Sequence, residues 1–154
     1  MNPIFEDTMS ILETLEKMWT EDSPINQTDL TDTTLATVKL HSKYMKYYNA
    51  AKLQLKRLES DKDKLLLLKT DYYLGNLDHQ TLKDNNWSPN KRVILKTDLP
   101  LHMNADNEII AANLKIAEVT QVVTFLDSVI RSINNRGFHI KNILDYEKFI
   151  NGTN

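Results

Sequence analysis

The stretch that decides the fold is Lys39–Gly75, which reads KLHSKYMKYYNAAKLQLKRLESDKDKLLLLKTDYYLG. At about 3.6 residues per turn, this pattern separates into two helical faces. A row of cations lies within about 40° of one line along the helix and consists of Lys39, Lys43, Lys46, Arg57 and Lys64. The opposite face is apolar and aromatic and consists of Leu40, Tyr44, Tyr47, Tyr48, Ala51, Leu55, Leu58 and Leu65. The sequence therefore predicts one long amphipathic helix.

This helix has two interpretations. Cations beside aromatic rings suit single-stranded nucleic acid, because the cations follow the phosphates and the rings stack on the bases. The same pattern is also typical of a solvated face opposite an ordinary core stripe. Other features of the sequence must decide between them.

The charge is distributed unevenly along the chain. Residues 1–38 carry eight acidic side chains and one basic side chain, whereas residues 39–69 carry nine basic and three acidic ones. The positive charge is therefore concentrated on one predicted element. An acidic block next to a basic block also permits pairing between segments or subunits, which would compete with nucleic acid for the same cations.

Length and composition limit the class of protein. A chain of 154 residues suits one domain, or one domain plus an assembly segment. It has no cysteine, which excludes disulfides and zinc–thiolate sites. We find no signal-peptide pattern and no run approaching the roughly 18 apolar residues of a membrane span. We therefore expect a soluble, cytoplasmic protein.

Residues that cap or break helices divide the chain into three regions. A short amphipathic helix is predicted over Thr8–Thr20, and Ser23–Pro24 ends it. The long helix that follows has Asp32 or Thr33 as its expected N-cap, and Gly75 terminates it. Residues 76–107 form a loop-rich connector with room for one short β-hairpin around Val93–Leu95. The fold class is thus mainly α, with an N-terminal helical region (1–75), a connector (76–107) and a C-terminal helical region (108–154).

The C-terminal region carries a second strong pattern. Apolar residues recur at alternating spacings of three and four, at Ile109, Ala112, Ile116, Val119, Val123, Leu126, Ile130 and Ile133. We interpret this seam as an assembly surface that joins copies in a closed ring, and the alternative is the central helix of a monomeric bundle. Arg136–Gly137 is predicted to end this helix, and a final short amphipathic helix from Phe138 to Phe149 is expected to fold back.

Enzymatic patterns are missing from the sequence. No glycine-rich phosphate loop ends in Lys-Ser/Thr, and no two of the four histidines are spaced i, i+4 as a helical zinc pair would be. No Ser/His/Asp constellation is evident. We therefore predict a protein that binds rather than catalyses, without a cofactor or a metal.

Four segments resemble one known family, the UvsY-type recombination mediators of tailed bacteriophages. They are Ile25–Leu30, Leu40–Tyr44, Lys69–Gly75 and Asn135–Ile143, the last reading NRGFHIKNI. Their order and approximate spacing match, and the resemblance extends from about Ser10 to Phe149. The Arg-Gly-Phe-x-Ile-Lys-x-Ile pattern in the last segment is the most specific.

The resemblance implies both an activity and partners. Proteins of this family bind single-stranded DNA as ring-like homo-oligomers, here expected as a hexamer or heptamer. They help a RecA-like recombinase to load onto strand covered by single-strand-binding protein, in recombination, repair and recombination-dependent replication. Neither nucleotide nor metal is required, and the expected location is the cytoplasm of the infected host cell. The alternative is a non-catalytic helical adaptor or structural protein that docks protein partners without binding DNA.

The sequence departs from the family at one point. The family pattern has two basic residues, two apart, just before the Asp-Tyr-Tyr segment, where this chain has Leu67 and Lys69. Only Lys69 carries over, so other cations of the long helix must supply the missing charge.

Two sets of site residues follow. The candidate single-stranded-DNA-binding residues are Lys43, Lys46, Lys56, Arg57, Lys62, Lys64, Lys69, Tyr72 and Tyr73. The candidate oligomerisation residues are Ile109, Ile116, Val119, Val123, Leu126, Ile130, Ile133 and Phe138.

Overall fold

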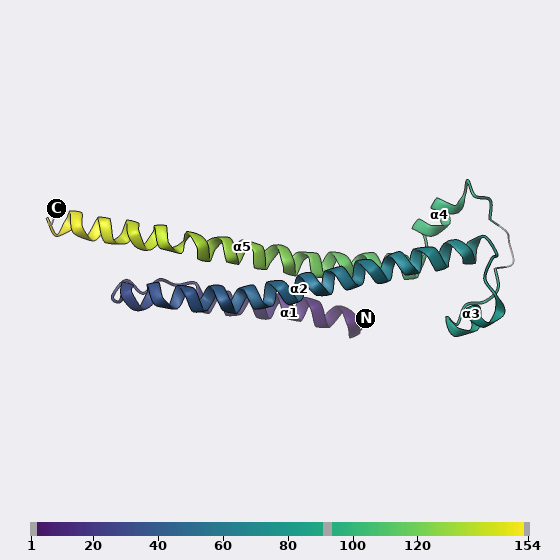
Figure 1. Ribbon diagram of the computed structural model, residues 1–154, viewed down its shortest axis with the longest axis horizontal. Helices are drawn as coiled ribbons and strands as arrows, with labels where there is room; N and C mark the ends of the chain where they lie inside the picture. Colours follow the sequence, from purple (N-terminus) through teal and green to yellow (C-terminus); the bar gives the residue numbers. More distant parts are fainter. Residues whose placement is uncertain (1–2, 91–93, 153–154) are drawn as a thin grey trace. The chain divides into compact units, whose positions relative to one another are not determined.

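The computed structural model describes residues 3–90 and 94–152, and it is built from helices (Figure 1). In chain order these helices are α1 (Pro3–Asp22), α2 (Leu30–Tyr73), α3 (His79–Asp84), α4 (Leu99–Asn104) and α5 (Asn107–Ile150). The described residues contain no strand, so the predicted hairpin is not found at Ile94 and Leu95, while Val93 lies outside the described residues. The expectation of a mainly α protein is confirmed.

The chain forms two compact units that both draw on the long helices. The first consists of Met1–Leu53 with Glu118–Asn154, and the second is Gln54–Ala117. Each unit therefore combines part of α2 with part of α5. The predicted boundaries after residues 75 and 107 instead fall close to the end of α2 and the start of α5.

Three helices supply the apolar core of the first unit. α1 contributes Leu15, α2 contributes Tyr44, and α5 contributes all the others; the full set is Leu15, Tyr44, Val122, Leu126, Val129, Ile130 and Ile133. The Tyr44 ring is fully buried and meets Trp19 edge to face, with 5.4 Å between ring centroids. The apolar face predicted for the long helix thus packs in this core at Tyr44, while Tyr47 is 40% exposed.

The ends of α2 show how local chemistry sets helix boundaries. The helix begins before the predicted caps Asp32 and Thr33, because Asp29 Oδ1 accepts a hydrogen bond from the Asp32 backbone N–H at 2.8 Å. The C-terminal prediction is confirmed: Gly75 has φ +73°, and the Asn76 N–H donates to the Asp71 carbonyl at 2.8 Å. This is a Schellman-type ending, which glycine permits at no steric cost.

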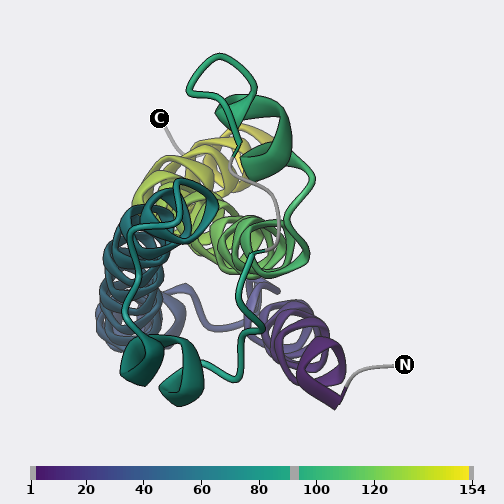
Figure 2. The ribbon, with the colours of Figure 1, turned by 90° about the vertical axis from the view of Figure 1, so that its right-hand side faces the viewer.

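The connector contains the two short helices α3 and α4, which face the viewer in Figure 2. The Asp78 side chain caps α3 by accepting from the Thr81 backbone N–H, and Leu82 is buried. The connector is therefore less loop-like than predicted.

The predicted helix end at Arg136–Gly137 is wrong, because α5 continues through Gly137 to Ile150. A mid-helix glycine costs about 1 kcal/mol relative to alanine, but packing on both sides outweighs this penalty. Arg136 and Ile140 are both buried, and the Arg136 guanidinium donates to the carbonyls of Ser23 and Pro24 at 2.7 Å each. The separate, folded-back final helix is consequently absent, and the first helix also runs longer than predicted, over Pro3–Asp22.

One described helix, α5, is long and apolar enough to cross a membrane by length and composition alone. This corrects the expectation that no stretch approaches that composition. The finding is weak evidence for a span, because core helices of soluble proteins have the same character, and α5 supplies most of the core of the first unit.

Candidate nucleic-acid interface

Helix α2 presents a series of exposed cations: Lys46, Lys52, Lys56, Arg57 and Lys64. Two of them make ion pairs within the helix, Lys56 with Glu59 at 3.4 Å and Lys64 with Asp61 at 3.3 Å. The Lys56 and Lys64 side chains are 81% and 73% exposed, respectively. Such pairs contribute about 0–1 kcal/mol and are screened by salt, so these cations remain available to another anion.

Lys43 lies in a different environment, within the first unit. Its Nζ pairs with Asp22 Oδ2 at 2.6 Å, and the Tyr44 hydroxyl donates to the same oxygen at 2.9 Å. Burial alone would raise the pKa of Asp22, but the hydrogen bonds from Lys43 and Tyr44 outweigh it and lower the pKa. Burial and the neighbouring Asp22 raise the pKa of Tyr44. Lys43 therefore helps to join α1 to α2.

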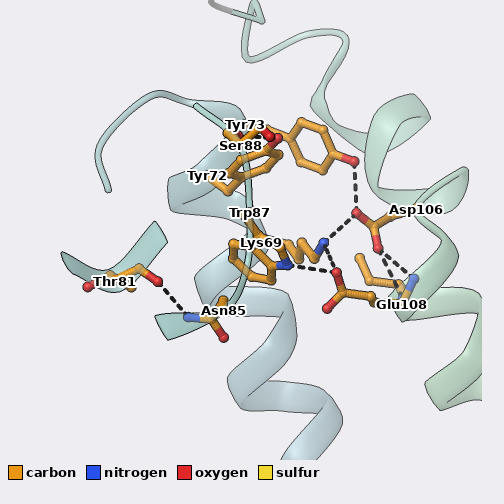
Figure 3. A network of polar contacts seen from close by, with 10 residues as sticks. Lys69, Tyr72, Tyr73, Thr81, Asn85, Trp87, Ser88, Asp106 and Glu108 are labelled. Carbon is orange, nitrogen blue, oxygen red and sulfur yellow. Dashed lines mark hydrogen bonds and ion pairs between the residues drawn. The ribbon is translucent and has the colours of Figure 1, made fainter. Parts of the chain in front are cut away.

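Lys69, drawn with its partners in Figure 3, differs most from the exposed cations. It is only 4% exposed. Its Nζ lies 3.0 Å from Asp106 Oδ2 and 2.9 Å from Glu108 Oε1. The same Nζ lies 4.0 Å from the centre of the Trp87 ring and 5.6 Å from that of Tyr72. Two carboxylates and two aromatic rings thus surround one ammonium group, which satisfies the requirement that a buried charge be paired.

Asp106 ties this cluster to the start of α5. Its Oδ1 accepts the backbone N–H groups of Glu108 at 2.9 Å and Ile109 at 3.2 Å, while its Oδ2 faces Lys69 and accepts the Tyr73 hydroxyl at 2.8 Å. Burial would raise the pKa of Asp106, but hydrogen bonds from Lys69 and Tyr73 prevail and lower it. One carboxylate therefore caps a helix and neutralises a buried cation.

The predicted stacking residues Tyr72 and Tyr73 both contact the connector. The Tyr72 hydroxyl donates to the Ser88 carbonyl at 3.0 Å, and the Tyr72 ring lies 5.3 Å from the Trp87 ring. Burial and the bond to Asp106 raise the pKa of Tyr73 to about 12. The Tyr73 hydroxyl is thus bound to Asp106 in the buried cluster, and the Tyr72 ring packs next to the Trp87 ring.

The candidate oligomerisation residues divide into two groups. Ile109, Leu126, Ile130 and Ile133 are at most 8% exposed within the single chain, and the last three belong to the core of the first unit. Ile116, Val119 and Val123 are half-buried. Only Phe138 is largely exposed, at 70%. Much of the seam is therefore occupied by the chain's own packing.

Sequence reasoning gave no role to Trp87, Asp106 or Glu108, and it named Arg136 only at a predicted helix end and in the family motif. The local signal in the sequence was Trp87, a tryptophan inside a polar, proline-containing connector. An indole in such a segment indicates a packing partner elsewhere in the chain. The other three are charged residues whose partners lie far away in the sequence. Within the described ranges, no three His, Cys, Asp or Glu side chains gather closely enough to hold a metal ion.

The fold and the charge distribution define a class of protein: an α-helical protein with two long helices, one of which carries a series of exposed cations. Within that class the chain belongs to the UvsY family: the family model described as "Recombination, repair and ssDNA binding protein UvsY" matches residues 18–153. This confirms the resemblance drawn from the sequence motifs.

A curated relative and solved structures agree with this assignment. The chain is 25% identical over 138 residues to "Recombination protein uvsY" of Enterobacteria phage T4, covering 90% of this chain and 96% of that protein. Two crystal structures of the T4 recombination mediator protein UvsY match with TM-scores of 0.77 and 0.78 at 24% identity. They cover 89% and 90% of this chain, and 95% and 98% of theirs. At this identity the structural match establishes the fold.

Proposed function

We propose that this protein is a recombination mediator that binds single-stranded DNA through the exposed cations of α2. The observation that carries the proposal is the exposure of Lys46, Lys56, Arg57 and Lys64 on one helix of a chain that belongs to a single-stranded-DNA-binding family. Surface cations bind phosphates mainly by releasing counterions, which requires exposure but no pre-formed pocket.

Lys62 is half-buried and Lys43 is paired with Asp22, so we assign both a smaller part in binding. Leu67, at one of the two positions where the family pattern has a basic residue, is 68% exposed. The exposed cations at Lys56, Arg57 and Lys64 supply the charge that Leu67 lacks. The DNA surface in this protein is accordingly shifted toward the middle of α2.

We further propose that several copies act together in a ring. A few exposed cations bind a strand weakly, whereas linked copies raise avidity without any new type of contact. The C-terminal end of α5 offers an apolar surface for assembly, since Phe138, Phe149 and Ile150 are 70%, 83% and 62% exposed. We assign these exposed apolar side chains, close to one helix end, to the contact between copies. The ring is expected to be a hexamer or heptamer, as the resemblance implies.

Mediation then follows from extending the strand. A strand held along successive basic helices is less available to a single-strand-binding protein, and its exposed parts become accessible to a RecA-like recombinase. The T4 relative is named a recombination mediator protein, and we extend that role to this chain. No step requires a nucleotide or a metal.

The test is a titration of labelled oligonucleotide at about 50 mM and about 200 mM salt. We expect a complex that weakens steeply with salt, with a slope of roughly −0.7 in log affinity per phosphate neutralised. The alternative, a helical adaptor that docks only proteins, predicts no salt-sensitive complex. Absence of such a complex would reject the proposed function.

A further inference from the structure

Glu108 occupies an unusual position in the Lys69 cluster. Its side chain is 50% exposed, yet its Oε1 accepts two hydrogen bonds, from Lys69 Nζ at 2.9 Å and from the Trp87 indole N–H at 2.7 Å (Figure 3). A single carboxylate oxygen thus links α2, the connector and α5. The other carboxylate on Lys69, that of Asp106, is buried and also caps α5.

The two carboxylates that contact Lys69 differ in how easily another anion can replace them. Asp106 alone balances the charge of Lys69 and is held by Tyr73 and by backbone N–H groups. Glu108 adds one further negative charge, and its half-exposed carboxylate accepts from Lys69 Nζ and from the Trp87 indole N–H. A phosphodiester also carries a single negative charge, so exchange of Glu108 for a phosphate leaves the net charge of the cluster unchanged.

Aromatic rings lie next to this exchangeable position. Trp87 and Tyr72 are half-buried, with 5.3 Å between their ring centroids, and Lys69 Nζ lies 4.0 Å from the Trp87 ring. Aromatic side chains beside a cation suit a nucleotide of single-stranded DNA, because the base stacks on a ring and the phosphate pairs with the cation. Every group involved belongs to the second compact unit.

We propose that Lys69, Trp87 and Tyr72 form a nucleotide subsite that Glu108 closes, and that single-stranded DNA opens it by replacing the Glu108 carboxylate with a phosphate. This inference rests on the proposed function and extends it to residues that the exposed basic face does not include. Glu108 then acts as an internal competitor, so that the subsite engages only a strand already held by the exposed cations of α2.

The exchange is physically accessible because a half-exposed carboxylate regains hydration when it leaves. The ion pair of such a group is weak compared with a fully buried one. The exposed cations Arg57 and Lys64 in the same unit raise the local concentration of the strand, which favours the phosphate over Glu108.

The direct test compares Glu108→Gln with Glu118→Gln. Both variants remove one negative charge from α5, but only Glu108→Gln removes the competitor while keeping an oxygen that accepts from Trp87. We expect Glu108→Gln to raise affinity for a poly-dT oligonucleotide by about fivefold, which corresponds to about 1 kcal/mol in binding free energy. Equal affinities of the two variants would overturn the inference.

A second measurement reports on the subsite itself. The chain has two tryptophans, and Trp19 lies in the first unit. The Trp19→Phe variant therefore leaves Trp87 as the single tryptophan whose fluorescence is measured. We expect poly-dT to quench Trp87 as a base stacks on it. Salt-sensitive DNA binding without any change in Trp87 emission would overturn the subsite while leaving the proposed function intact. No DNA binding at all would instead reject the proposed function.

Discussion

Two lysines on the same helix, five residues apart, have opposite environments. The Lys64 side chain is 73% exposed and pairs with Asp61 of the same helix. The Lys69 side chain is 5% exposed and pairs with Asp106 and Glu108. Both lie in α2 and in the same compact unit. The comparison shows that a row of cations in a sequence combines two kinds of residue: cations that a ligand can reach directly, and a cation that holds the fold.

The largest expected effect is on the buried cation. Asp106→Ala leaves Lys69 with only Glu108 and removes the cap of α5, so we expect a loss of about 4 kcal/mol in unfolding free energy, about 3 from the broken buried pair and about 1 from the cap. Asp61→Ala, which removes the partner of Lys64, should cost no more than about 0.5 kcal/mol. Urea unfolding measures both, and equal costs would contradict the comparison.

The same distinction applies to apolar residues. Leu126 is fully buried and Leu67 is 68% exposed. Leu126→Ala should lower the unfolding free energy by about 3 kcal/mol, within the range for buried leucines, while Leu67→Ala should change it by less than about 0.5 kcal/mol. If Leu126→Ala dissociated the assembly with no loss of monomer stability, Leu126 would belong to the seam between copies after all.

Assembly is expected to depend on exposed residues instead. A double change of Phe138→Asp and Phe149→Asp places charge on the apolar end of α5, where both side chains are largely exposed. We expect the native mass to fall toward that of one protomer while the helical circular dichroism persists, because neither residue belongs to the core of the first unit. A native mass identical to that of the unchanged protein would exclude this surface from assembly.

A smaller effect is expected from pH. The pKa of Asp106 is lowered in the folded protein, so its ionised form stabilises the fold. That contribution is fully present above the unfolded pKa of about 3.9 and is lost as pH falls through the lowered folded value. The stability difference between the unchanged protein and Asp106→Ala should therefore be large at neutral pH and shrink below pH of about 3.9. If the difference in unfolding free energy between the two proteins stayed constant into strong acid, the charge of Asp106 would not contribute to stability.

Much of the fold could be predicted from the sequence, because the information is local. The 3.6-residue pattern identified the long helices, and Gly75 identified the end of α2 through a backbone conformation that glycine adopts readily. The family could be recognised from four short segments. Helix termination at Gly137 was predicted wrongly, because the interactions that carry α5 onward come from Arg136 and the distant Ser23 and Pro24.

The candidate site was less predictable for the same reason. The partners of Lys69 lie 37 and 39 residues away in the sequence, at Asp106 and Glu108, and no periodicity connects them. Sequence alone therefore grouped Lys69 with Lys64. Similarly, an apolar seam has the same spacing whether its partner is another copy or the rest of the same chain, and here Leu126, Ile130 and Ile133 pack within the chain.

The most direct test concerns the exposed cations of α2 as the DNA surface. The measurement is the slope of log affinity for poly-dT against log salt for the variant Lys46→Ala/Lys56→Ala/Lys64→Ala. A matched control, Lys83→Ala/Lys96→Ala/Lys141→Ala, removes the same charge from exposed positions outside α2. We predict that the slope becomes shallower by about 2 in the first variant for each protomer that contacts the strand, and stays unchanged in the control. An unchanged slope in the first variant, or equal changes in both, would contradict the account.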